Sequence, residues 1–139
     1  MRKVRAALMT EVVNLLDTQF PGLQYIMENE ERPTGTGNWV ELFFKPADTH
    51  VFTLGAGGLD ALPGVVMVNV HTQLDNGPGY GISVVDAFRR HFVAGLRVIF
   101  EGQEVQVTNC SANLGRVINT WSRADISIGF TAYLTRGVA

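Results

Sequence analysis

Few residues of this 139-residue chain have the types and spacing needed for chemistry, and the most conspicuous are the glycine-rich residues 53–58 (TLGAGG). A dinucleotide-binding loop needs glycines at its first, third and sixth positions, and counted from Gly55 the sixth position is Asp60. The chain also lacks the Gly-Lys-Ser/Thr ending of a P-loop. The run leads into an expected strand, so no helix N-terminus is available to meet a phosphate. We interpret it as a conformationally free loop or a hairpin connection and predict no cofactor.

The candidate metal ligands are His50, His71, His91 and Cys110. Successive members are 21, 20 and 19 residues apart, and these spacings match no finger or helical metal-binding pattern. We therefore interpret the four residues as structural or surface side chains and predict no metal site.

Nucleophilic catalysis has no better support in the sequence. Residues 81–85 (GISVV) begin like a nucleophile elbow but lack its second glycine. Cys110 has no identifiable base partner, and a lone cysteine usually serves as a small hydrophobic side chain. We predict no catalytic residue and a protein that is not an enzyme.

Length and charge set broader limits. The length fits a single domain, taken as residues 1–139, which would bury roughly 68% of its unfolded surface. The formal net charge of −2 argues against general affinity for nucleic acid or anionic membranes. No apolar run approaches the ~18 residues of a membrane span, and Thr10, Glu11 and Asn14 interrupt the stretch where a secretory signal would be apolar. The single cysteine is typical of a reducing compartment.

Hydrophobic periodicity predicts an α+β fold, a single domain whose mainly antiparallel sheet has two helices packed on one face. Helices are expected over 2–20 and after the turn at 76–79, the second with Val84, Val85, Phe88 and Phe92 on one side. Strands are expected over 23–28, 39–45, 50–54, 65–74, 97–100, 105–108 and 124–135. The last strand should direct inward Ile126, Ile128, Phe130, Ala132 and Leu134. Residues 29–37 are the most polar and turn-rich stretch and are expected to form a mobile loop.

The order of these elements, with the motif at residues 52–58 (FTLGAGG) and the strand at 64–71, resembles a known family. It is similar to the tail terminator proteins of long-tailed bacteriophages and to the related tail-completion-like proteins of prophages. The resemblance covers most of the chain, from the first helix to the last long strand. The chain departs from the family just after the glycines, where Leu59, Asp60, Ala61 and Leu62 replace residues that are often basic or polar.

The resemblance implies a structural virion protein that caps the tail tube, ends its polymerisation and forms the interface to the head connector. It implies a homohexameric ring at the head-proximal end of the tail, assembled in the cytoplasm of the bacterial host. The partners would be further copies of the chain, the major tail tube protein and head–tail connector proteins, with no membrane and no specific nucleic acid binding. Two alternatives stay open: a head-completion or minor tail protein, and a small-ligand-binding protein that uses residues 55–58.

We expect the contacts with neighbouring subunits or the tube to come from the polar loop, the two-faced strand at 39–45, the glycine-rich loop at 55–64 and the second helix. The outer face of the last strand is a further candidate. The expected interface residues are Arg32, Thr34, Thr36, Trp39, Phe43, Leu54, Leu59, Asp60, Leu62, Arg89 and Arg90.

Overall fold

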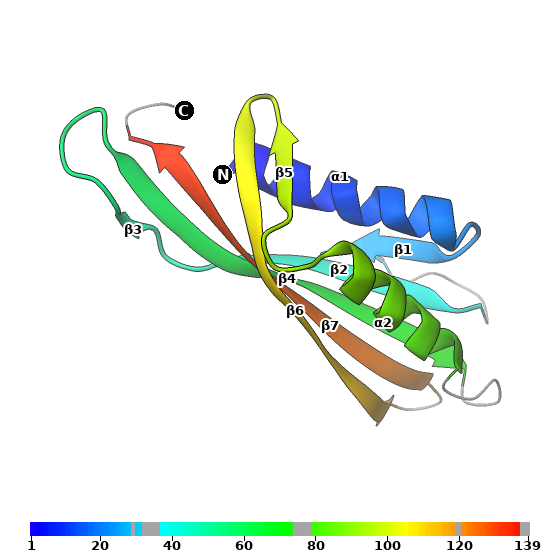
Figure 1. Ribbon diagram of the computed structural model, residues 1–139. Coiled ribbons are helices and arrows are strands. Elements are labelled where there is room, and N and C mark those ends of the chain that lie inside the picture. Colours follow the sequence, from blue (N-terminus) through cyan, green and yellow to red (C-terminus); the bar gives the residue numbers. More distant parts are fainter. Residues whose placement is uncertain (29, 32–36, 74–78, 119–120, 137–139) are drawn as a thin grey trace.

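The computed structural model describes residues 1–28, 30–31, 37–73, 79–118 and 121–136. Within them the chain forms a single domain of two helices and a mostly antiparallel, curled seven-stranded sheet (Figure 1). The elements are α1 (Arg2–Gln19), β1 (Gln24–Met27), β2 (Trp39–Pro46), β3 (His50–Val51), β4 (Leu59–Gln73), α2 (Gly79–His91), β5 (Arg97–Phe100), β6 (Gln103–Ile118) and β7 (Trp121–Thr135). The strand order is β1-β2-β4-β7-β6-β5, with β3 paired to β4. The pair β1–β2 is parallel and the other pairs are antiparallel.

The strands β4 and β7 form the spine of the sheet. They pair over their full fifteen residues, from Leu59 opposite Thr135 to Gln73 opposite Trp121. Alternate side chains of both strands enter the core because successive side chains of a strand point to opposite faces. The buried members are Val66, Val68 and Val70 of β4 and Ile126, Ile128, Phe130 and Ala132 of β7. The inward face expected for the last strand is confirmed, with Leu134 only partly buried.

Strand β4 begins earlier than the sequence indicated. A loop over 55–64 was expected, but residues 59–64 belong to the strand, which pairs with β7 on one side and with β3 and β2 on the other. The turn-like residues Pro63 and Gly64 fit the sheet. Gly64 is opposite Phe130, and a Cβ at Gly64 would lie 2.6 Å from Cζ of that ring. Only glycine therefore leaves room for the Phe130 ring, which also stacks on Phe44 with centroids 5.5 Å apart.

Strand β6 is also longer than expected. The hairpin with β5 was predicted to end at 108, but β6 continues to Ile118 along β7. The pairing register shifts between Val107 and Asn109 and again between Asn113 and Arg116. At the first shift, Gly129 N donates to Asn109 Oδ1 at 3.1 Å, so a side chain replaces a main-chain partner of the ladder. The uncharged, non-alternating run at 108–114 gives no period-two signal, which is why the sequence did not reveal this half of the strand.

The helices supply the rest of the core. In α1 the most buried side chains are Val4, Leu8, Val12 and Leu16, and the helix ends before Pro21 and Gly22. In α2 the expected apolar side is confirmed: Val84, Val85 and Phe88 are buried, as is Phe92 just beyond the helix. These residues and the inward residues of β7 belong to one core cluster. The finer expectation, that both helices pack on one face of the sheet, stays a prediction.

Candidate functional site

The part of the molecule most suited to contact another one is an extension of the sheet that we call the arm, residues 47–60 and 133–136. It contains β3, the glycine-rich loop and the paired ends of β4 and β7. In Figure 1 it extends beyond both helices at one end of the long strands.

The arm is fixed by Arg136, which follows β7 directly. Its Nε and Nη2 donate to Asp60 Oδ1 at 3.2 and 2.9 Å. Its Nη2 also donates to the carbonyl oxygen of Thr53 at 2.6 Å, and its Nη1 donates to that of Gly55. The main chain adds a bond from Arg136 N to Gly58 O at 2.9 Å. One guanidinium therefore joins the loop, the start of β4 and the end of β7; we call this cluster the Arg136 clasp.

The glycines of the loop fit this closed arrangement. Gly55 has a φ of +102°, a left-handed conformation that favours glycine. A Cβ at Gly58 would lie 2.5 Å from the carbonyl oxygen of Thr53, so only a residue without a side chain fits between Thr53 and the clasp. Leu59 N donates to Thr53 Oγ1 at 2.6 Å and Gly58 N donates to Gly55 O at 3.1 Å. The loop connects the antiparallel strands β3 and β4, so the interpretation of a hairpin connection is confirmed. These amides are bonded within a closed loop, which differs from the alternative of a conformationally free loop.

The surface of the arm is apolar although its interior is polar. The side chains of Val51, Phe52, Leu54 and Tyr133 are 59%, 58%, 91% and 41% exposed. The rings of Phe52 and Tyr133 lie 4.7 Å apart between centroids, which joins β3 and β7 on this surface. Large apolar side chains grouped on a rigid extension are typical of a contact with another protein.

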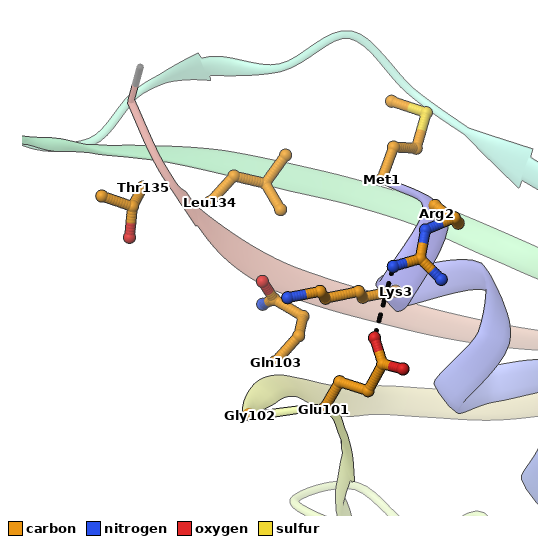
Figure 2. Close-up of a pocket in the computed structure, with 8 residues that line it drawn as sticks. All are labelled: Met1, Arg2, Lys3, Glu101, Gly102, Gln103, Leu134 and Thr135. Carbon is orange, nitrogen blue, oxygen red and sulfur yellow. Dashed lines mark hydrogen bonds and ion pairs between the residues drawn. The ribbon is translucent and has the colours of Figure 1, made fainter. Parts of the chain in front are cut away.

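An open hollow of about 280 Å³ lies beside the arm, between the start of α1, the β5–β6 turn and the end of β7. Figure 2 shows its lining residues, Met1, Arg2, Lys3, Glu101, Gly102, Gln103, Leu134 and Thr135. Arg2 Nη2 and Glu101 Oε2 form a salt bridge at 3.2 Å across its rim, and both side chains are more than half exposed. Such a pair contributes little to stability, and it places no nucleophile beside a base.

A second candidate surface is the sheet face opposite the core. Trp39 stacks on His71 there with ring centroids 3.9 Å apart and an interplanar angle of 3°, and its side chain is only 5% exposed. Asn69 and Asp125 are buried on the same face, and Arg123 Nε donates to Asp125 Oδ1 at 2.5 Å. Phe43 is half-buried, with Lys45 Nζ 5.5 Å from its ring centroid. This surface is separate from the arm.

Comparison with known proteins now identifies the family. A family model described as phage tail terminator protein matches residues 3–130. The chain belongs to the phage tail terminator family. That family is a structural, non-enzymatic kind of protein, so the chain is a phage tail-related structural protein and a component of the virion tail. The resemblance inferred from the sequence is confirmed.

The likeness to solved structures supports the fold. One solved structure, 21% identical, superposes with a TM-score of 0.76 and covers 93% of this chain and 92% of its own. Comparison with curated proteins gives no match.

The structure gives roles to the residues after the glycines, where we expected this terminator to depart from its family. Asp60 binds Arg136, while Ala61 and Leu62 are buried, Leu62 completely. The prediction that Leu62 belongs to the contact surface is therefore wrong. Strand β4 begins at Leu59, and the side chain of Leu62 points into the core. Leu54, Leu59 and Asp60 do come together on the arm.

The remaining candidate residues lie elsewhere in the terminator. Trp39 and Phe43 lie on β2, and Arg89 and Arg90 are exposed on the last turn of α2. Burial raises the pKa of the Cys110 thiol, and the Arg89 guanidinium lowers it. Helix α2, which carries Arg89, contacts β6. The polar-loop candidates lie outside the described residues: Arg32, Thr34 and Thr36.

Sequence reasoning missed the residue that organises the arm. Arg136 could have been found only from the register, since Asp60 and Leu59 are opposite Leu134 and Thr135. It also missed Val51 and Phe52, whose positions look like those of ordinary strand residues. Tyr133 lies on the outer face of the last strand, which the sequence analysis did include as a candidate surface.

The histidines are dispersed in the structure. His91 Nε2 lies 2.6 Å from Glu11 Oε1, joining α2 to α1, while His71 stacks on Trp39 and His50 is exposed on β3. Among the described residues, no group of three or more His, Cys, Asp or Glu side chains could hold a metal ion. Within the same residues, no helix has both the length and the apolar character needed to cross a membrane.

Proposed function

We propose that this terminator caps the tail tube, ends its polymerisation and forms the interface to the head connector. The observation that carries the proposal is the family match over residues 3–130. The rigid arm with an apolar surface supports it, because a protein that ends a polymer must bind the polymer end and block the next subunit.

The assembly we propose is a homohexameric ring around a central channel, located at the head-proximal end of the tail and assembled in the host cytoplasm. Its partners would be further copies of itself, the major tail tube protein and the head–tail connector proteins. A ring requires a heterologous contact, in which one patch meets a different patch on the next copy. The arm is suited to one side of such a contact, since it is well separated from the α2 surface and from the far half of β6.

Deletion of the gene from the phage or prophage that carries it tests this function. We expect overlong tails that do not join heads, and restoration of normal tails when the wild-type chain is supplied from a plasmid. Tails of normal length that lack heads would indicate a head-completion role. Fully infectious particles would exclude the proposal.

A further inference from the structure

The outer edge of β6 is unpaired over a regular segment. Strand β5 pairs with Gln103–Gln106 only, and Val107 exchanges main-chain bonds with Leu96 and Gly95. From Thr108 onward, no further strand of the described residues lies along β6 on the side away from β7. Residues 109–113 keep a continuous register with β7 between two register shifts. We call residues 109–113 the β6 edge.

The composition of the β6 edge does not protect it from pairing. Exposed edge strands usually carry charged side chains or prolines that prevent pairing with another chain. The β6 edge (NCSAN) contains neither. Ser111, Ala112 and Asn113 are exposed, and the next residue, Leu114, is 47% exposed. The flanking register shifts limit any added strand to about the length of this window.

We propose that the β6 edge is a strand-pairing site and that its occupant is residues 47–52 of a second copy of this chain. This inference rests on the proposed ring and specifies the contact between neighbouring subunits, which we call the seam. The occupant belongs to the arm and includes β3, which pairs with β4 on one side only among the described residues. Its six residues are close in number to the five of the β6 edge, and main-chain bonds at a free edge are a common mode of recognition.

Charge supports this occupant. Arg89 is on the last turn of α2, a helix that contacts β6, and Asp48 lies in residues 47–52. Both side chains are exposed, and within the described residues neither forms a salt bridge. An arm strand added to the β6 edge brings an unpaired carboxylate toward an unpaired guanidinium.

The positions of the two elements suit a ring. The arm is at the Leu134 end of β7, whereas the β6 edge is opposite Ile126 and Ile128. Eight residues of strand separate Leu134 from Ile126, which corresponds to about 27 Å. Figure 1 shows the arm at one end of the long strands and the far half of β6 toward the other. Two different edges of one chain give the head-to-tail contact that a ring requires.

Chemical cross-linking tests the seam. In a Cys110→Ser background, Val51→Cys on the arm and Ser111→Cys on the β6 edge are made as two single-cysteine proteins. They are mixed at high concentration with a short bis-maleimide. We expect cross-linked dimers from the mixture and none from either protein alone. Dimers from Ser111→Cys alone would show that β6 edges pair with each other and would overturn the proposal.

A chain that carries both cysteines, Val51→Cys and Ser111→Cys, tests whether the seam exists in the assembled tail. When this chain complements the deletion, bis-maleimide treatment of isolated tails should give a ladder of covalent oligomers. Tails of normal length in which the terminator stays a single unlinked band would overturn the seam and leave the proposed function standing. If the purified mixture cross-links but deletion of the gene leaves tails unchanged, the contact between the arm and the β6 edge would be supported. The proposed tail function would then be excluded.

Charge reversal gives a second test that needs no cysteine. Asp48→Arg and Arg89→Asp should each lower the titre of complemented phage by about tenfold or more, and the double variant should recover most of the loss. Asp17→Arg makes the same charge change as Asp48→Arg at an exposed position of α1. It is the control and should have no effect. Single variants that complement fully, or a double variant worse than both, would contradict the pairing of Asp48 with Arg89.

Discussion

Arg136 and Asp60 are 76 residues apart in the chain and are joined by two hydrogen bonds to a single carboxylate oxygen, Asp60 Oδ1. The same guanidinium binds the carbonyl oxygens of Thr53 and Gly55. The side chain that follows the last strand therefore determines the conformation of a loop that follows the third strand.

Arg136→Ala should free the arm without unfolding the domain. Both charged partners are 28% exposed, so the salt bridge contributes only about 0–1 kcal/mol to global stability. We expect nearly unchanged thermal unfolding, faster hydrogen exchange at the amides of Gly58 and Leu59, and poor complementation of the gene deletion. Arg97→Ala removes a more exposed surface pair with Glu104, away from the arm loop, and is the control. Unchanged exchange at both amides would show that the clasp does not hold the loop.

Gly58→Ala should disrupt the arm, and Gly57→Ala should not. A Cβ at Gly58 meets the Thr53 carbonyl oxygen at 2.5 Å, whereas a Cβ at Gly57 has nothing within 4 Å. Overpacking of this kind costs about 1–3 kcal/mol. Denaturant unfolding combined with hydrogen exchange should reveal the loss for Gly58→Ala alone. Equal behaviour of the two variants would contradict the loop geometry.

Phe88→Ala should destabilise the domain far more than Phe52→Ala. Phe88 is fully buried, stacks on Phe92 at 5.6 Å and shares a core cluster with Ile126, Ile128 and Phe130. Removal of a buried aromatic side chain costs about 3–5 kcal/mol, while exposed substitutions usually stay within about ±0.5 kcal/mol. Denaturant melts measure both values. A loss below about 1 kcal/mol for Phe88→Ala would be inconsistent with a buried site of this kind.

Leu54→Asp should leave the fold intact and remove function. This side chain is 91% exposed on the arm, so a carboxylate there disturbs no internal packing but would be costly at an apolar contact. We expect unchanged melting and overlong tails in complementation. Val93→Asp, 51% exposed between α2 and β5, is the matched control and should give normal tails. Normal tails with Leu54→Asp would exclude the arm tip from the contact.

Cys110 should alkylate slowly at mildly alkaline pH. Burial raises the pKa of its thiol and outweighs the lowering by Arg89, so less thiolate is present at a given pH than in an unfolded chain. Arg89→Ala removes the lowering cause, and the pH profile of iodoacetamide alkylation should then move further upward. A shift to lower pH, or faster alkylation of the variant, would contradict this arrangement of Arg89 and Cys110.

The sequence predicted the elements whose side chains alternate clearly and missed those defined by pairing. Val66, Val68 and Val70 of β4 and Ile126 and Ile128 of β7 follow a period of two, so their strands and inward faces could be recognised. The start of β4 contains Pro63 and Gly64, which indicate a turn unless the partner strands and the Phe130 ring are known. The half of β6 after Thr108 has no apolar alternation and is held by its ladder with β7.

The candidate site was predictable in its location but not in its chemistry. The glycine-rich residues 53–58 stood out in the sequence, and the structure places Leu54 exposed among them; its role in a contact stays a prediction. The contact between Asp60 and Arg136 depends on a register between strands that are distant in the chain, and local patterns do not encode it.

The long ladder between β4 and β7 has a mechanical consequence for a component of a virion tail. Hydrogen bonds of an antiparallel pair run perpendicular to the strands, so tension along the strand axis loads many of them at once, whereas tension across it would break them one after another. The arm lies at the end of this axis. We expect a force applied there to act on the ladder in shear, its most resistant direction, so that such a force would extend the domain very little.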